Sequence, residues 1–157
     1  MIIGIMGPGE GASEAVTKTA FALGQAIAKQ GWTVLTGGRN VGVMHAASQG
    51  AKSIGGQTIG ILMDADKKRM SEYVDIPIIT DLGSARNNIN VLTSDVVVAC
   101  GMGPGTASEV SLAVKAKKPV ILVNATEHEQ TFFNNLGVPA THCVTCSDAV
   151  IELIKRY

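Results

Sequence analysis

Three glycine-rich segments of this chain have the residue types and spacing that suit phosphate binding. They are Gly4–Gly11, Thr36–Gly42 and Gly101–Thr106. Each one follows a short apolar run and precedes a stretch of helical periodicity, so each is predicted to join a strand to a helix. Glycine lets a ligand approach the main chain closely, and a helix start presents free N–H groups and partial positive charge. Such turns also occur for packing alone, but three together predict a pocket for a small anionic, phosphorylated ligand.

Two arginines lie in or near these segments. Arg39 is part of the second glycine segment, and Arg86 lies in Gly83–Asn90, just after another apolar run. A guanidinium group binds phosphate in a bidentate manner. The alternative for each is an ordinary surface arginine. We predict that both arginines hold the anionic end of the ligand.

Glu109 has two interpretations. The spacing Thr106-x-x-Glu109 matches a capping box, in which both side chains satisfy N–H groups of the first helical turn. Losing such a cap costs about 1 kcal/mol. Alternatively, the carboxylate faces the pocket, where it activates water or stabilises positive charge on a sugar. The spacing alone does not separate these two roles.

Other common sites are absent or incomplete. The first glycine segment does not reproduce G-x-G-x-x-G, no acidic residue follows the second apolar run, and no Walker loop is present, so ordinary NAD and ATP sites are disfavoured. Cys143 and Cys146 form a lone C-x-x-C, and a structural zinc site needs four ligands. We therefore predict no metal site. His45 and His128 are read as ordinary helix residues.

The elements that position these residues alternate along the whole chain. Apolar runs rich in Val and Ile predict buried strands at Ile2–Met6, Thr33–Thr36, Thr58–Leu62, Ile76–Thr80, Val96–Cys100, Val120–Val123 and His142–Thr145. Helices are predicted after Ser13, as the N-cap of the first one, and at 42–53, 84–93, 106–117, 127–136 and 147–156. The pattern predicts an α/β fold, a Rossmann-like, doubly wound and mostly parallel sheet with helices on both faces. The charged stretch Asp64–Asp75 is read as a solvated surface loop.

Composition narrows the function classes. The 157 residues are expected to form one domain, residues 1–157. Hydrophobic residues make up 46% and charged residues 17%, which excludes a disordered chain. Thirteen basic residues balance thirteen acidic ones, and aromatics are 4%, so no nucleic-acid partner is expected. We see no secretory signal, no membrane span and no disulfide framework, and we expect a cytoplasmic protein.

The glycine motifs resemble those of a known superfamily. Gly101–Glu109 resembles the P-G-G-x-G-T-x-x-E signature of the lonely-guy-type phosphoribohydrolases, within the lysine-decarboxylase-like Rossmann superfamily, and Gly37–Met44 resembles their glycine loop. Two differences stand out. The hydrolases have Arg-Lys where this chain has Arg86-Asn87, and Pro-Gly-Gly where it has Met102–Gly105. Both differences argue against catalysis.

The stronger resemblance is to the molybdenum cofactor carrier proteins. It rests on Gly7–Gly9, Thr36–His45, Gly83–Asn90 and Gly101–Val110, and it covers nearly the whole chain. It implies a homo-oligomer, a dimer or a tetramer, that binds the molybdenum cofactor (molybdopterin) without turnover. It also implies transfer of the cofactor to molybdoenzymes or cofactor-synthesis proteins.

The carrier interpretation leads to a set of expected binding residues. These are Gly7, Pro8, Gly9, Gly37, Gly38, Arg39, Asn40, Gly83, Ser84, Arg86, Asn90, Gly101, Met102, Gly103, Pro104, Gly105, Thr106 and Glu109. Glycine N–H groups and the two arginines would hold the phosphate, and Asn40, Asn88 and Asn90 would bind the pterin edge. Two alternatives stay open: a hydrolase of nucleoside 5′-monophosphates, in which Arg86 and Glu109 are catalytic, and a sensor that binds a nucleotide.

Overall fold

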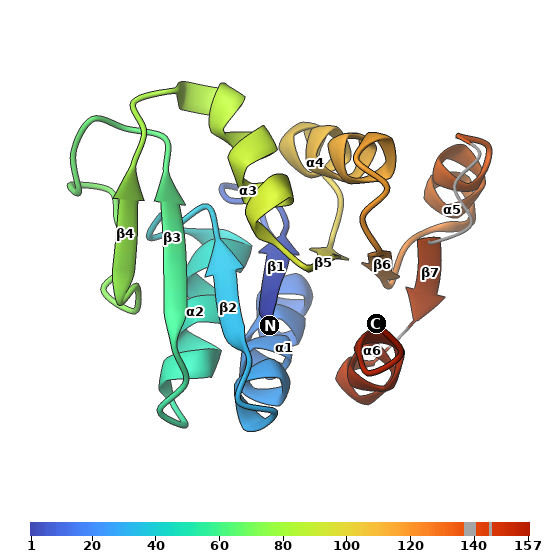
Figure 1. The fold of residues 1–157 in the computed structure, drawn as a ribbon, viewed down its shortest axis with the longest axis horizontal. Helices are drawn as coiled ribbons and strands as arrows, with labels where there is room; N and C mark the ends of the chain where they lie inside the picture. The colour runs from blue at the N-terminus through green and yellow to red at the C-terminus, as the bar shows by residue number, and fades with distance from the viewer. Residues whose placement is uncertain (137–140, 145) are drawn as a thin grey trace.

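The computed structural model of the protein describes residues 1–136, 141–144 and 146–157, and only the backbone of residues 141–143. Its described part contains a seven-stranded sheet in the order β4-β3-β2-β1-β5-β6-β7, and every neighbouring pair is parallel (Figure 1). The strands are β1 (Ile2–Met6), β2 (Thr33–Thr36), β3 (Thr58–Leu62), β4 (Ile76–Ile79), β5 (Val96–Cys100), β6 (Val120–Val123) and β7 (Thr141–Val144). The predicted α/β fold with a parallel sheet is confirmed.

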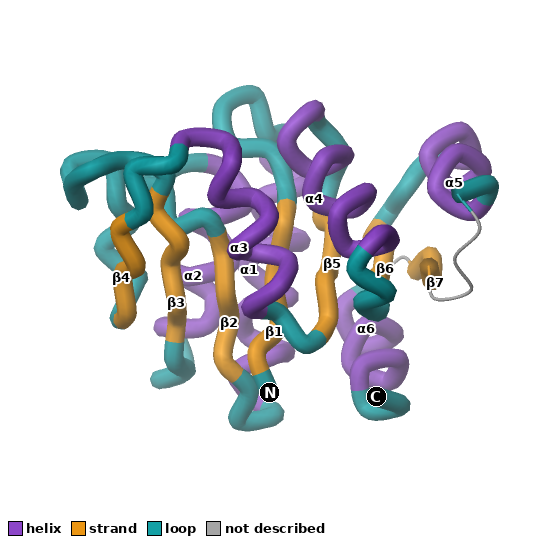
Figure 2. Tube along the Cα trace, turned by 45° about the horizontal axis from the view of Figure 1, so that its top comes forward, coloured by secondary structure: helices purple, strands orange, loops and turns teal. Residues whose placement is uncertain are grey.

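Helices cover both faces of this sheet, as predicted (Figure 2). They are α1 (Glu14–Lys29), α2 (Gly42–Lys52), the 3-10 helix η1 (Gly83–Arg86), α3 (Asn87–Thr93), α4 (Pro104–Lys115), α5 (Glu127–Asn134) and α6 (Ser147–Ile154). One apolar core forms between the sheet and α1, α2 and α6, and it includes Leu23, Val43 and Ile154. The other forms against α3, α4 and α5. Both faces of the central strands are therefore buried, which explains their unbroken Val and Ile runs.

The helices α1 and α2 pack backbone to backbone. A Cβ atom added to Gly24 would overlap the carbonyl oxygen of Ala47, and one added to Gly50 would overlap that of Phe21. Each helix thus contributes one glycine to the crossing. Ser13 caps α1 as predicted, because its Oγ accepts a hydrogen bond from the Val16 N–H at 3.3 Å.

The order in which the chain adds strands to the sheet reverses at β1. Strands β2, β3 and β4 lie on one side of β1, and strands β5, β6 and β7 lie on the other. Strand β1 pairs with β2 on one side and with β5 on the other. The loops that follow β1 and β5 therefore diverge to opposite faces of the sheet and leave a crevice between them. In open parallel sheets, ligands bind at such a switch point.

Three predictions about the elements need correction. Strand β4 is not buried: Ile76, Ile78 and Ile79 are 40–48% exposed, because β4 is the edge strand of the sheet. The predicted helix at 84–93 consists of η1 followed by α3, and the predicted helix at 106–117 begins earlier, at Pro104. Of the predicted strand His142–Thr145, Thr145 lies outside the described residues.

The segment Asp64–Asp75 is not simply a solvated loop. The Ser71 N–H donates to the carbonyl oxygen of Gly38 at 2.9 Å, and the Asn40 N–H donates to that of Arg69 at 2.8 Å. Ser71 itself is fully buried. The segment therefore lies along the second glycine loop and fixes its backbone.

Candidate functional site

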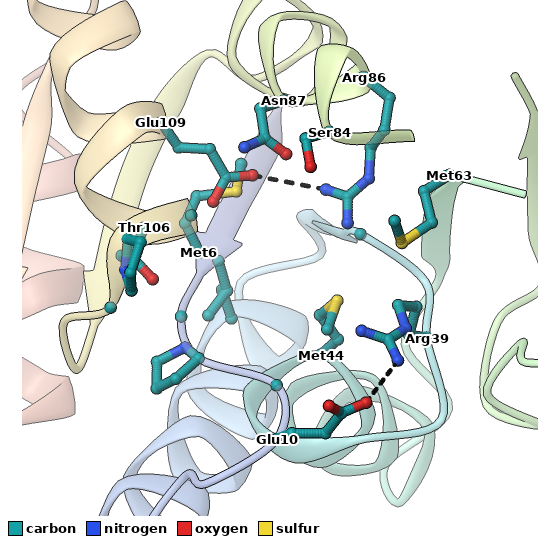
Figure 3. A pocket seen from close by; sticks show the side chains of 18 residues that line it. Met6, Glu10, Arg39, Met44, Met63, Ser84, Arg86, Asn87, Thr106 and Glu109 are labelled. Atoms are coloured by element: carbon teal, nitrogen blue, oxygen red, sulfur yellow. Dashed lines mark hydrogen bonds and ion pairs between the residues drawn. The ribbon is translucent and has the colours of Figure 1, made fainter. Parts of the chain in front are cut away.

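A pocket of about 260 Å³ opens at the switch point of the sheet (Figure 3). The loops after β1, β2 and β3, the helix η1 and the start of α4 all contribute to it. It is lined by Ile5, Met6, Gly7, Pro8, Gly9, Glu10, Gly37, Arg39, Met44, Met63, Ser84, Arg86, Asn87, Gly103, Pro104, Gly105, Thr106 and Glu109. The three glycine segments, which lie far apart in the sequence, thus meet around one cavity.

A buried cluster of polar groups forms one wall of the pocket. Arg86 is only 8% exposed and Glu109 only 6%. Nη1 of Arg86 lies 3.5 Å from Oε1 of Glu109, and the Asn90 side-chain amide donates to the same oxygen at 2.7 Å. The Nε atom of Arg86 is buried without a hydrogen-bond partner among the described residues. The guanidinium group therefore retains hydrogen-bonding capacity for a ligand.

Gly37 makes room for the Arg86 guanidinium group. A Cβ atom at position 37 would lie 2.7 Å from Cζ of Arg86, well inside van der Waals contact. The backbone of Gly37 thus supports the flat face of the guanidinium group. Burial lowers the pKa of Arg86, and the positive charge of Arg39 lowers it further, whereas Glu109 opposes this shift. Both cations line the same pocket, and the repulsion between them favours an anionic ligand near both.

Glu109 does not cap its helix. Helix α4 begins at Pro104 with Gly103 as N-cap, and no side chain caps it. Thr106 and Glu109 are therefore inside the helix, and the capping-box interpretation is wrong. The Glu109 carboxylate instead points toward Arg86 (Figure 3). Burial raises the pKa of Glu109 from 4.5 to about 6, although the Asn90 hydrogen bond and the Arg86 charge lower it.

The raised pKa predicts a pH-dependent stability that Glu109→Gln abolishes. The folded protein favours the protonated carboxyl, so the stabilising contribution is full below pH 4.5 and is lost as pH rises through about 6. The loss amounts to about 2 kcal/mol. Urea unfolding of both proteins at pH 4.5 and pH 7 should show the wild type losing most of this amount relative to Glu109→Gln. A stability difference that stays constant with pH would contradict the assignment.

The start of α4 continues the wall of the pocket beyond Glu109. Its first turn has no side-chain cap, and Gly105 and Thr106 of that turn line the pocket. The hydroxyl of Thr106 is buried without a partner among the described residues. A helix N-terminus with a free hydroxyl group is a suitable place for a phosphate. Arg39 approaches from the far side, where its Nη2 lies 2.8 Å from Oε1 of Glu10.

The structure brings many of the expected residues to this pocket but not all. Twelve of the expected residues line it, and six do not: Gly38, Asn40, Gly83, Asn90, Gly101 and Met102. Asn90 lies behind the wall and holds Glu109. Asn88 is exposed and does not line the pocket either. Which of these residues bind ligand stays a prediction.

Sequence reasoning missed six lining residues, which are Ile5, Met6, Glu10, Met44, Met63 and Asn87. Met6 ends β1 and Met63 directly follows β3, so their place at the carboxyl edge of the sheet was a usable signal. Met44 lies in the first turn of α2, and Asn87 follows Arg86. Three thioether side chains thus supply the apolar part of the pocket.

The two cysteines whose side chains are described, Cys100 and Cys146, do not line the pocket. Cys100 is buried, and burial raises the pKa of its thiol to about 12. Cys146 is exposed at the start of α6, whereas the side chain of Cys143 lies outside the described part of the chain. Among the described residues, no group of three or more His, Cys, Asp or Glu side chains could hold a metal ion. No described helix is long and apolar enough to cross a membrane.

Comparison with known proteins shows which families and solved structures the chain is similar to. The family model described as the SLOG cluster4 family matches residues 1–153. A structure of the molybdenum cofactor binding protein from Rippkaea orientalis is 56% identical, with a TM-score of 0.96, over 99% of this chain and 95% of that one. The molybdenum cofactor carrier protein of Chlamydomonas reinhardtii is 50% identical, with a TM-score of 0.93, over 99% and 96%.

An enzyme is also related, at lower identity. A cytokinin riboside 5′-monophosphate phosphoribohydrolase of Mycobacterium tuberculosis is 31% identical over 117 residues, which are 69% of this chain and 63% of the enzyme. The chain therefore resembles both groups that its glycine motifs indicate, and it resembles the carriers over almost its whole length.

Proposed function

Since this chain belongs to the SLOG cluster4 family, we propose that it binds and carries the molybdenum cofactor without turnover. The observation that carries the proposal is the pocket at the switch point. There, an uncapped helix start and two arginines surround a cavity of about 260 Å³. Proteins 50–56% identical to this chain, over 99% of its length, bind or carry this cofactor. The cofactor is the cargo of the protein here rather than a resident group.

The residues of the pocket fit the chemistry of this cargo. The cofactor ends in a phosphate, which the free hydroxyl of Thr106 and the first amides of α4 suit. The Arg86 guanidinium group, with its unpartnered Nε, supplies positive charge beside it. The pterin and its sulfur-rich dithiolene are flat and polarizable, which suits the thioethers of Met44 and Met63. The pocket offers no thiolate from a described residue, so transfer of the metal need not break a bond to the protein.

A carrier must release what it binds, and we propose that it does so to another protein. The acceptors would be molybdoenzymes or cofactor-synthesis proteins. We further propose that the carrier works as a homo-oligomer, a dimer or a tetramer. The exposed apolar side chains of Ile76 and Ile78 on β4 and of Leu92 on α3 support an assembly of this kind.

One observation favours a second candidate function. Glu109 reaches the pocket beside Arg86, and these are the two residues that the resemblance to the phosphoribohydrolases implies as catalytic. A carboxyl with a pKa of about 6 suits general acid and base chemistry near neutral pH. The buried carboxylate also has a purely electrostatic role, because it neutralises Arg86. We favour this electrostatic role, and the following experiment separates the two.

Anaerobic titration of the purified protein with isolated molybdenum cofactor tests the proposal. We expect saturable binding with one cofactor for each chain, because one pocket collects the phosphate-binding groups. In parallel, incubation with AMP should release no adenine. Absence of cofactor binding would refute the carrier function. Adenine release that disappears in Glu109→Gln, while that variant still unfolds cooperatively, would establish the hydrolase instead.

A further inference from the structure

A second pocket adjoins the first one. It has a volume of about 330 Å³ and is lined by Glu10, Arg39, Asn40, Val41, Lys68 and Arg69. Glu10 and Arg39 line both pockets. The proposed binding of the cofactor's phosphate and pterin does not use this second pocket.

The ion pair between Glu10 and Arg39 forms the wall between the two pockets. The atoms of the pair are 2.8 Å apart, and Figure 3 shows the pair at the edge of the first pocket. The Glu10 side chain is 80% exposed, so only the loop after β1 and this one contact hold it in place. An exposed ion pair contributes little stability. An incoming anion can therefore displace Glu10 from Arg39 at small cost, and the two pockets then become continuous.

Backbone contacts fix the basic residues of the second pocket. The carbonyl oxygen of Arg69 accepts a hydrogen bond from the Asn40 N–H at 2.8 Å, and Met70 forms an isolated antiparallel bridge with Arg39. The segment that carries Lys68 and Arg69 is thereby tied to the loop that carries Arg39. Because these backbone contacts hold the two segments together, Arg39, Lys68 and Arg69 line the same pocket.

Each of the three cations of the second pocket is paired with one carboxylate, so a bound anion has to replace these partners. Of the three carboxylates, only that of Glu10 lines the pocket. Lys68 and Arg69 pair with Asp66 and Asp64, but all four side chains are at least a quarter exposed. Helix α2 begins directly beyond Val41, its N-cap, and no side chain caps it. The second pocket, like the first, thus has a helix start beside an arginine, although the Val43 N–H of α2 already donates to the Pro8 carbonyl oxygen at 3.1 Å.

We infer that the second pocket binds a second phosphoryl group, so that the protein also accepts a ligand extended by a pyrophosphate bond. This inference rests on the proposed function and deepens it. Arg39 lines both pockets, so anions in the two pockets lie on either side of one guanidinium group. A pyrophosphate bond is the shortest link by which one ligand can present two phosphoryl groups to the same arginine. The extended ligand is of the nucleotide-linked type, in which the terminal phosphate of the cargo carries a further phosphoryl group and its substituent.

Calorimetric titration with inorganic phosphate, pyrophosphate and the isolated cofactor tests this inference. We expect the wild type to bind pyrophosphate about tenfold more tightly than phosphate. In the double variant Lys68→Gln/Arg69→Gln this preference should disappear, whereas the affinity for the cofactor, with its single phosphate, stays unchanged. Glu10→Gln should strengthen pyrophosphate binding more than phosphate binding, because the competing carboxylate is gone.

The matched control is Lys67→Gln/Lys115→Gln. It removes the same charge, from two exposed lysines that line neither pocket. If this control weakens pyrophosphate binding as much as Lys68→Gln/Arg69→Gln does, net charge explains the effect and the second subsite is refuted. Equal affinity for the two anions in the wild type would refute it as well. If the cofactor does not bind while the pyrophosphate preference follows Lys68 and Arg69, the proposed cargo is wrong and the subsite stands.

Discussion

Replacing Arg86 by methionine is expected to weaken binding of the molybdenum cofactor by about a hundredfold. Arg86 is 8% exposed, and its Nε has no partner among the described residues, so little water competes with a bound anion. Methionine keeps most of the side-chain volume and removes only the charge and the donors. Anaerobic titration of the variant measures the loss of affinity.

Two controls separate binding from folding for Arg86. Arg156→Met removes an equal charge from an exposed position near the carboxyl end, and it should leave affinity unchanged. Arg86→Met also leaves the buried Glu109 carboxylate without its cation, which costs stability. The double variant Arg86→Met/Glu109→Gln should recover stability but not affinity. Cofactor affinity that stays within twofold of wild type in this stable double variant would refute the role of Arg86.

Gly37→Ala is expected to reduce cofactor affinity by about tenfold or more and to lower stability by no more than Arg86→Met does, because both changes take the cation away from Glu109. The new methyl group would occupy the space of the Arg86 guanidinium group, whose Cζ lies 2.7 Å from the position of the added Cβ. Since the end of an arginine side chain can move, the protein folds, but the guanidinium group leaves its place. Affinity and the midpoint of urea unfolding, measured on the same sample, report the two effects separately.

A double-mutant cycle tests this explanation of the Gly37 effect. Once Arg86 is methionine, Gly37→Ala has no guanidinium group to displace, so the second change should cost almost no further affinity. Additive losses would show that Gly37 contacts the ligand itself. The cycle therefore distinguishes a glycine that positions Arg86 from a glycine that the cofactor touches.

The fold and the centre of the site could be predicted from the sequence for one physical reason. Parallel strands end at the same edge of a sheet, so glycine segments that follow separate strands must converge there. Gly7, Gly37 and Gly103 do meet around one pocket. This argument needs only the order of strands and helices, which the apolar runs indicate clearly.

The remaining features depend on packing that local patterns do not contain. Thr106 and Glu109 have capping-box spacing, yet Pro104 starts the helix two residues earlier and turns the carboxylate toward Arg86. The isoleucines of β4 resemble those of a central strand, and only the strand order shows that β4 lies at the edge. Likewise, nothing in the charged sequence of residues 64–75 indicates that Ser71 is buried against Gly38.

The glycine contacts between α1 and α2 bear on how cargo leaves the protein. Gly24 and Gly50 bring two backbones together with no side chain between them, so neither helix can slide or tilt without a clash. The loops at the starts of these helices, which carry Gly9 and Arg39, therefore behave as one rigid body. We therefore expect the movement that releases cargo in the other half, where η1 and the start of α4 meet the pocket. Slow amide hydrogen exchange along α1 and α2, beside faster exchange in η1, would be the signature of such a one-sided hinge.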